Sequence, residues 1–555
     1  MTQRLLSIVT LLSLPLAATA LPRPPATRPA TPGRVPDITP VYAPGAVFVA
    51  LDDRMPRTKL RPAVYVSDLC VYRYRVGTRS PECQKFVDQA LGYFYSYVWI
   101  ETARSAETAL LHDPDCAYAW LVLHKGLERW GQGDAIGALK KAQELLPKAP
   151  HREQLLITAR LHEKGLLGGG GVEERRKRAA QALDEMLTIY DDDEEAWFAR
   201  GALHGGFQGG PAEGVPFYKS LLRIDPLHPG ANHELVHFYE GSQRPALGWP
   251  YAVGYMKSSP GTPHAWHMQA HLATRIGKWD KTSDWSAHAI ELEREYHRVQ
   301  GVKHHQDHQF SHHLETLTFS LLHDGRFREA ADIKREAEGY GLRFTQPWFR
   351  LAIGRRDWDA AEKVVTELRK SDKPLAAYLA AVLDLERGDT AGAAAEIDVL
   401  RQAQQKRKDD RRLEQRLWEV QGRHLCQTGS GESGLKLLQR LVEKTKDSYA
   451  HHAWGNGAVY MEAWGIGALD AGNAEKAEEG FLEALAHDAG SVRAALGMSA
   501  LCGRVGRPDE ARKFEALARR LWSKADPVDF EALRDDLIRR AAHVPAAATT
   551  AAGSR

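Results

Sequence analysis

Apolar side chains follow a helical period along most of this chain. From about residue 86 to about residue 526 they recur every three or four positions, in segments of roughly 12 to 18 residues. Glycines, Asp-Pro pairs and Gly-Asn pairs separate the segments, and such residues end helices and begin turns. The pattern therefore predicts an all-α fold built from one helical hairpin after another.

The two ends of the chain depart from this pattern. An apolar run at 5–17 follows Arg4 and precedes small residues, which predicts a signal sequence at 1–20 and a secreted or periplasmic protein. Residues 21–46 are dense in proline and predict an extended tether. Residues 47–85 alternate with a period nearer two and predict a short hairpin or extended cap, whereas the Ala/Thr-rich tail at 541–555 is expected to be disordered.

The helical segments also repeat at a fixed interval, because Pro226 and Pro260 close successive segments 34 positions apart. First helices carry tryptophan, leucine and glycine landmarks, and second helices carry small alanines: Trp120, Leu123, Gly126, Trp197 and Gly201, then Ala135, Ala138 and Ala142. In these features about four fifths of the chain resembles the tetratricopeptide repeat family, least clearly at 148–192 and 340–450. The resemblance implies an α-solenoid at 86–526 whose first helices line a concave groove that binds a protein or peptide.

Charge and composition exclude several classes of partner. Lys and Arg number 74 against 72 Asp and Glu, and a net charge of +2 gives no field that would steer nucleic acid. No stretch beyond the signal sequence approaches the ~20 apolar residues of a membrane helix, so no membrane insertion is expected. The five cysteines are too scattered for a disulfide scaffold; they are either buried thiols or include one bridge between Cys70 and Cys83.

Histidines occupy the same slots in successive repeats. After Pro226 and Pro260, the first helices of the following hairpins are expected to begin at Pro229 and Pro263. Both helices then have histidine in the fifth and ninth positions, one turn apart on one helical face. If Phe310 is aligned with Leu235, the first helix of the next hairpin has the same pair. Three such pairs are improbable by chance, because only 24 of the 555 residues are histidine. The three pairs are His233 and His237, His267 and His271, and His308 and His312.

Pairs of imidazoles at this spacing suit a transition metal, most of all Zn²⁺, with Cu, Ni or Fe as further options and Ca²⁺ and Mg²⁺ disfavoured. Adjacent first helices lie ~8–10 Å apart, a gap that imidazoles from both sides can span. We therefore expect one ion shared by the first two pairs, with the third pair adding a ligand or a second site. Glu240 and His264 lie close by on the same faces and are further candidate ligands.

The first pair also forms an H-E-x-x-H motif, in which Glu234 would be the general base of a zinc peptidase. The second pair lacks this glutamate, and Leu235 and Tyr239 match packing positions of the repeat. Met268 and Trp266, which flank His267, are interpreted as packing residues. Three hypotheses follow: an exported scaffold that binds a metal and a protein partner, which we favour; a metal-free protein-binding scaffold whose histidines form a polar groove; and a zinc hydrolase.

Overall fold

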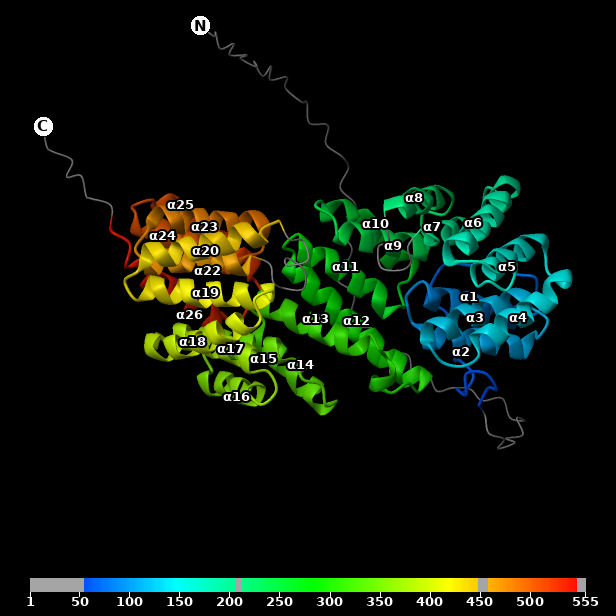
Figure 1. Cartoon of the computed structure of the whole chain (residues 1–555), viewed down its shortest axis with the longest axis horizontal. Coiled ribbons are helices and arrows are strands. Elements are labelled where there is room, and N and C mark those ends of the chain that lie inside the picture. Colours follow the sequence, from blue (N-terminus) through cyan, green and yellow to red (C-terminus); the bar gives the residue numbers. More distant parts are fainter. Residues whose placement is uncertain (1–53, 205–211, 448–457, 547–555) are drawn as a thin grey trace, which may run out of the picture. The chain divides into compact units, whose positions relative to one another are not determined.

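The computed structural model describes residues 54–204, 212–447 and 458–546. In this part of the chain 74% of the residues are helical, in 25 α-helices and four short 3₁₀-helices, and there is no β-strand, so the predicted all-α fold is confirmed. The helices before the histidine-rich region are α1 (Pro81–Phe94), α2 (Trp99–His112), α3 (Ala117–Trp130), α4 (Ala135–Leu145), α5 (His151–Glu163), α6 (Val172–Ile189), α7 (Glu194–Ala202) and α8 (Val215–Ile224) (Figure 1).

The remaining helices continue the same alternation to the end of the described chain. They are α9 (Pro229–Glu240), α10 (Trp249–Ser258), α11 (Pro263–Arg275), α12 (Trp279–Gln300), α13 (Phe310–His323), α14 (Phe327–Gly339), α15 (Thr345–Gly354), α16 (Trp358–Leu368), α17 (Lys373–Arg387), α18 (Thr390–Lys406), α19 (Arg411–Gln427), α20 (Gly431–Thr445), α22 (Val459–Asp470), α23 (Ala474–His487), α24 (Val492–Arg504), α25 (Pro508–Leu521) and α26 (Pro527–Ala541).

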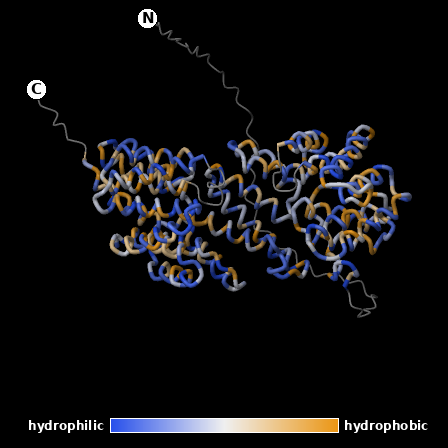
Figure 2. Tube along the Cα trace, viewed as in Figure 1, coloured by the Kyte–Doolittle hydropathy of each residue, from blue (hydrophilic) through white to orange (hydrophobic). Residues whose placement is uncertain are grey.

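From α1 to α25 each described helix packs against the next described one along the chain, and α26 packs against α24 and α22. First helices of successive hairpins also touch, as α9 and α11, α13 and α15, and α17 and α19 do. Figure 2 shows hydrophobic and hydrophilic positions alternating along the helices, as expected where each helix buries one face. The apolar side chains form several local clusters, because each hairpin completes its core with its neighbours.

A recurring hydrogen bond marks the start of the first helices. The fourth residue of the helix donates from its side chain to the backbone carbonyl six positions earlier, in the preceding turn. Tryptophan does so in α3, α7 and α11, and asparagine does so in α9. The pairs are Trp120 with Pro114, Trp197 with Asp191, Trp266 with Pro260 and Asn232 with Pro226, at 2.8, 2.8, 2.9 and 3.1 Å.

Residues 54–80 form no hairpin but an extended segment held by side chains of the helices. Backbone groups of Val66 and Ala63 donate to Gln89 and Thr108, and Gln300 both donates to and accepts from the backbone of Val64. The extended half of the expected cap is thus present, and α1 begins slightly earlier than expected. The predicted signal sequence, the tether and most of the tail lie outside the described residues.

Contacts far apart in sequence also join the C-terminal helices to the middle of the chain. The indole nitrogen of Trp522 donates to the carbonyl of His323 at 2.6 Å, and that of Trp279 donates to Asp488 at 3.1 Å. In the described residues all five cysteines are buried thiols, so the bridge between Cys70 and Cys83 is absent. None of the described helices is long and apolar enough to cross a bilayer.

Candidate metal centre

Helices α9 and α11 begin as the repeat frame predicts. Each has proline as its first residue, where the missing N–H is not needed, and the His228 side chain accepts from Ala231 N to cap α9. With these starts, the first pair and the second pair of histidines occupy the fifth and ninth positions of their helices. Within each helix the two histidines therefore lie one turn apart on the same face, as their spacing in the sequence predicts.

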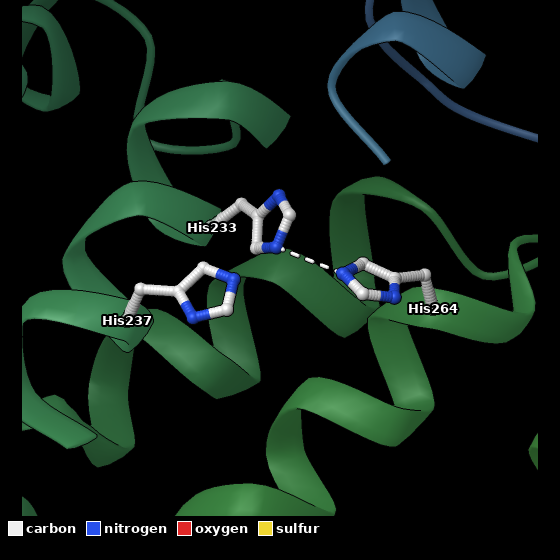
Figure 3. Close-up of side chains that lie close together, drawn as sticks. All are labelled: His233, His237 and His264. Carbon is white, nitrogen blue, oxygen red and sulfur yellow. Dashed lines mark hydrogen bonds between the residues drawn. The ribbon is translucent and has the colours of Figure 1, made fainter. Parts of the chain in front are cut away.

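The first histidine group consists of His233, His237 and His264, whose ligand nitrogens all lie within 4.8 Å of one another. Figure 3 shows the imidazoles of His233 and His237, from α9, facing that of His264, from the first turn of α11. The Nε2 atoms of His233 and His264 are 3.0 Å apart. Three imidazoles thus converge on one small, buried space between the two helices.

The hydrogen bonds at the outer nitrogens decide which ring atoms are ligands. The Nδ1 atom of His233 lies 2.7 Å from the backbone carbonyl of Tyr95, which can only accept, so Nδ1 carries the proton and Nε2 a lone pair. The Nδ1 atom of His237 faces Oε2 of Glu240 at 3.5 Å, and its Nε2 is buried with no hydrogen-bond partner among the described residues. The lone pair on His233 Nε2 faces Nε2 of His264 at 3.0 Å, whereas His237 Nε2 points into the same space with no hydrogen-bond partner among the described residues.

The second histidine group consists of His267, His271 and His312, again with ligand nitrogens within 4.8 Å of one another. The Nε2 atom of His267 is 2.6 Å from that of His271 and 3.0 Å from that of His312. The Nδ1 atom of His271 lies 2.9 Å from Oε1 of Glu240. His312 comes from α13 and is the most exposed of the three.

Burial lowers the pKa of four of these imidazoles, those of His233, His264, His267 and His312, and so favours their neutral form. Burial holds the pKa of His233 and of His267 well below the usual value, and neighbouring imidazoles lower it further. Burial alone would raise the pKa of Glu240, but His271 and His237 hold it well below its usual range. Neutral imidazoles and an ionised carboxylate are the states in which these side chains bind and orient a metal.

The grouping differs from the single four-histidine site expected from the sequence. Glu240 lies between the two pairs, and the ring centroids of His237 and His271 are 6.4 Å apart. Each pair instead gains a third imidazole from elsewhere, His264 from the start of α11 and His312 from α13. Of the two extra candidates, His264 is a group member and Glu240 supports both groups.

The third predicted pair is wrong as a helical pair. Helix α13 begins at Phe310, so His308 precedes the helix; it is exposed and belongs to neither group. The physical reason is a turn in which the side chain of Asp307 accepts from the backbone of Gln309 at 3.0 Å. Leu235 was thus not a valid guide to the register of this helix.

Glu234 does not join the converging nitrogens. Successive residues on a helix are rotated by about 100°, so Glu234 leaves the face that His233 and His237 share. Its carboxylate accepts from the hydroxyl of Tyr97 at 2.7 Å. The Tyr97 ring lies 4.4 Å from that of His233, in a residue with a left-handed backbone (φ 59°).

Several residues near the groups carried no sequence signal. Tyr95 and Tyr97 lie in the connection between α1 and α2, more than a hundred residues before α9. The Nδ1 atom of His313 lies 2.7 Å from a carboxylate oxygen of Glu293, and its Nε2 is buried without a partner among the described residues.

Met268 is fully buried in an apolar cluster, as its interpretation as a packing residue predicted.

Comparison with known proteins does not assign a function to this site. No protein-family model matches the sequence, and no curated protein is similar to it. The two histidine groups are therefore the basis for a proposed function.

Proposed function

We propose that this protein binds a transition-metal ion, Zn²⁺ by preference, through His233, His237 and His264. The observation that carries the proposal is the convergence of ring nitrogens from three histidines, of which the buried Nε2 atom of His237 lacks a hydrogen-bond partner among the described residues. Burying an unpaired polar atom costs roughly 1–3 kcal/mol, and a cation bound between the ring nitrogens offsets that cost.

The ligand set favours the borderline transition metals. Three neutral nitrogens at about 2.0–2.1 Å suit Zn²⁺ and leave a fourth position for water or a ligand, whereas Ca²⁺ and Mg²⁺ require oxygen. Imidazoles also accept Cu, Ni and Fe, so ion preference must be measured by competition. The exported tetratricopeptide-type scaffold and a protein or peptide partner remain part of the proposal on the sequence resemblance alone.

A hydrolase is less well supported, because the carboxylate of Glu234 accepts from Tyr97 and belongs to neither histidine group. A Glu234→Gln variant separates the two ideas. We expect it to keep its metal, and any peptidase activity found in the wild type that disappears in this variant, with the metal retained, would favour the hydrolase.

The proposal is tested on protein purified without a histidine tag, stripped with a chelator and titrated with Zn²⁺. We expect tight binding that the His264→Ala variant weakens strongly. His308→Ala is the matched control, since His308 is exposed and outside both groups. Absence of stoichiometric metal in the wild type, or equal affinity in the His264→Ala variant, would overturn the proposal and leave the metal-free scaffold.

A further inference from the structure

The second histidine group has the same construction as the first, and the two meet at one carboxylate. We propose that His267, His271 and His312 bind a second divalent ion of the transition series, and that Glu240 orients ligands of both ions in a two-ion centre. The inference rests on the proposed function, because it takes the first group to hold one ion.

Proton counting in the second group indicates a cation. Glu240 accepts from Nδ1 of His271, so in the neutral imidazole, the form that binds a metal, the Nε2 atom of His271 carries a lone pair. His267 brings its Nε2 within 2.6 Å of that atom and within 3.0 Å of Nε2 of His312. The Nε2 atom of His267 holds either one proton or one lone pair, so it can form a good hydrogen bond with only one of these two neighbours. A cation accepts all three lone pairs at once.

Glu240 connects the two groups through different oxygens. Its Oε1 atom is 2.9 Å from Nδ1 of His271, and its Oε2 atom is 3.5 Å from Nδ1 of His237. An ionised carboxylate only accepts, so both imidazoles turn an Nδ1–H toward it and direct their Nε2 atoms into separate groups. A histidine held in this way by a carboxylate is a recurrent arrangement at metal sites, and losing the carboxylate typically weakens binding 10–100-fold.

The two groups belong to one buried cluster of rings. The ring of His264, from the first group, lies 5.7 Å from that of His267, from the second. The His313 ring lies 4.0 Å from His267 and 5.7 Å from His264, on the side held by Glu293. One negative charge at Glu240 lies against both groups and reduces the repulsion between two bound cations.

Stoichiometry tests the second ion. The wild-type protein is expected to bind two Zn²⁺, and the His233→Ala and His267→Ala variants one each, with helical content checked by circular dichroism. The His308→Ala control should keep two. A wild type that binds one ion, or a His267→Ala variant that keeps two, overturns the second site while leaving the proposed function intact. A wild type that binds none refutes the proposed function itself.

Two substitutions at Glu240 test the shared carboxylate. A glutamine offers one acceptor and one donor, so Glu240→Gln can orient only one of the two histidines, and we expect one site to weaken 10–100-fold while the other keeps its affinity. Glu240→Ala should weaken both. Unchanged affinities at both sites in the Glu240→Ala variant would show that this carboxylate does not orient the ligands.

Cu²⁺ provides a readout of proximity that does not depend on activity. The single-site variants loaded with one Cu²⁺ should give the spectrum of an isolated ion in electron paramagnetic resonance. The wild type loaded with two should give a broadened or diminished signal, because neighbouring unpaired spins interact. A wild-type spectrum equal to the sum of the two single-site spectra would overturn the two-ion centre.

Discussion

Replacing Gly230 with alanine perturbs the contact that orients His233. Gly230 is the second residue of α9, and a β-carbon there would lie 2.3 Å from Cδ1 of Tyr95 and 2.6 Å from Cε2 of Phe198. Carbon atoms in contact are about 3.5–4.0 Å apart, so α9 or Tyr95 must move by on the order of 1 Å. Overpacking of this kind costs about 1–3 kcal/mol. The movement acts on the 2.7 Å bond between His233 Nδ1 and the carbonyl of Tyr95.

We therefore expect the Gly230→Ala variant to unfold at lower urea concentration and to bind Zn²⁺ about 10–100-fold more weakly, because His233 loses the acceptor that fixes its tautomer. Competition with a chromophoric chelator measures the affinity. Gly241→Ala is the matched control just beyond α9, where the added β-carbon has no neighbour closer than 3.9 Å. A Gly230→Ala protein that is destabilised yet binds Zn²⁺ with wild-type affinity would refute the role given to the Tyr95 carbonyl.

Two further predictions concern buried carboxylates of the scaffold. Burial opposes ionisation of Glu195, but Lys125 and the Tyr95 and Tyr118 hydroxyls hold its pKa below the usual value. The Tyr118→Phe variant loses a 2.7 Å hydrogen bond to this carboxylate, so its free energy of unfolding in urea should fall by about 1.5–3 kcal/mol. A loss below about 0.5 kcal/mol would contradict an ionised Glu195. Burial raises the pKa of Asp488 from 3.8 to about 7, so its contribution to stability is full below pH 3.8 and is lost as the pH rises through about 7. Asp488→Asn should flatten the fall in the urea midpoint between pH 5 and pH 8, and an unchanged pH profile would count against this assignment.

The helical array was accessible from the sequence because its signals are local. Proline at the first position of α9 and α11, and aspartate caps such as Asp372 of α17, define helix starts within a few residues. The start of α13 was misplaced because the connection that follows α12 is built differently, with a 3₁₀ turn at His304–Gln306 and the Asp307 turn directly before the helix. Register carried over from one repeat to the next fails where a connection changes, as it does after the long helix α12.

The candidate site was accessible only in part, for the same reason. Spacing within one helix identified His233 with His237 and His267 with His271, and nearness in sequence identified His264 and Glu240. Which imidazoles share a group depends on distances between helices, and the repeat frame does not contain those distances. The carbonyl of Tyr95 has no sequence signal at all, since every residue has a carbonyl and only the fold brings this one to α9.

The buried histidines also distinguish a metal centre from a polar groove. A metal-free groove gains nothing from His237 Nε2, which is buried without a partner among the described residues, and a leucine of similar volume removes this unpaired atom. We therefore expect His237→Leu to leave the chelator-treated protein as stable as the wild type or slightly more so. Zn²⁺ at 100 times its dissociation constant should stabilise the wild type by about 2.7 kcal/mol and the variant much less. Urea unfolding with and without Zn²⁺ measures both quantities. A loss above about 2 kcal/mol in the metal-free variant would instead mean that His237 maintains the fold through its own contacts, and the metal would no longer be needed to explain its burial.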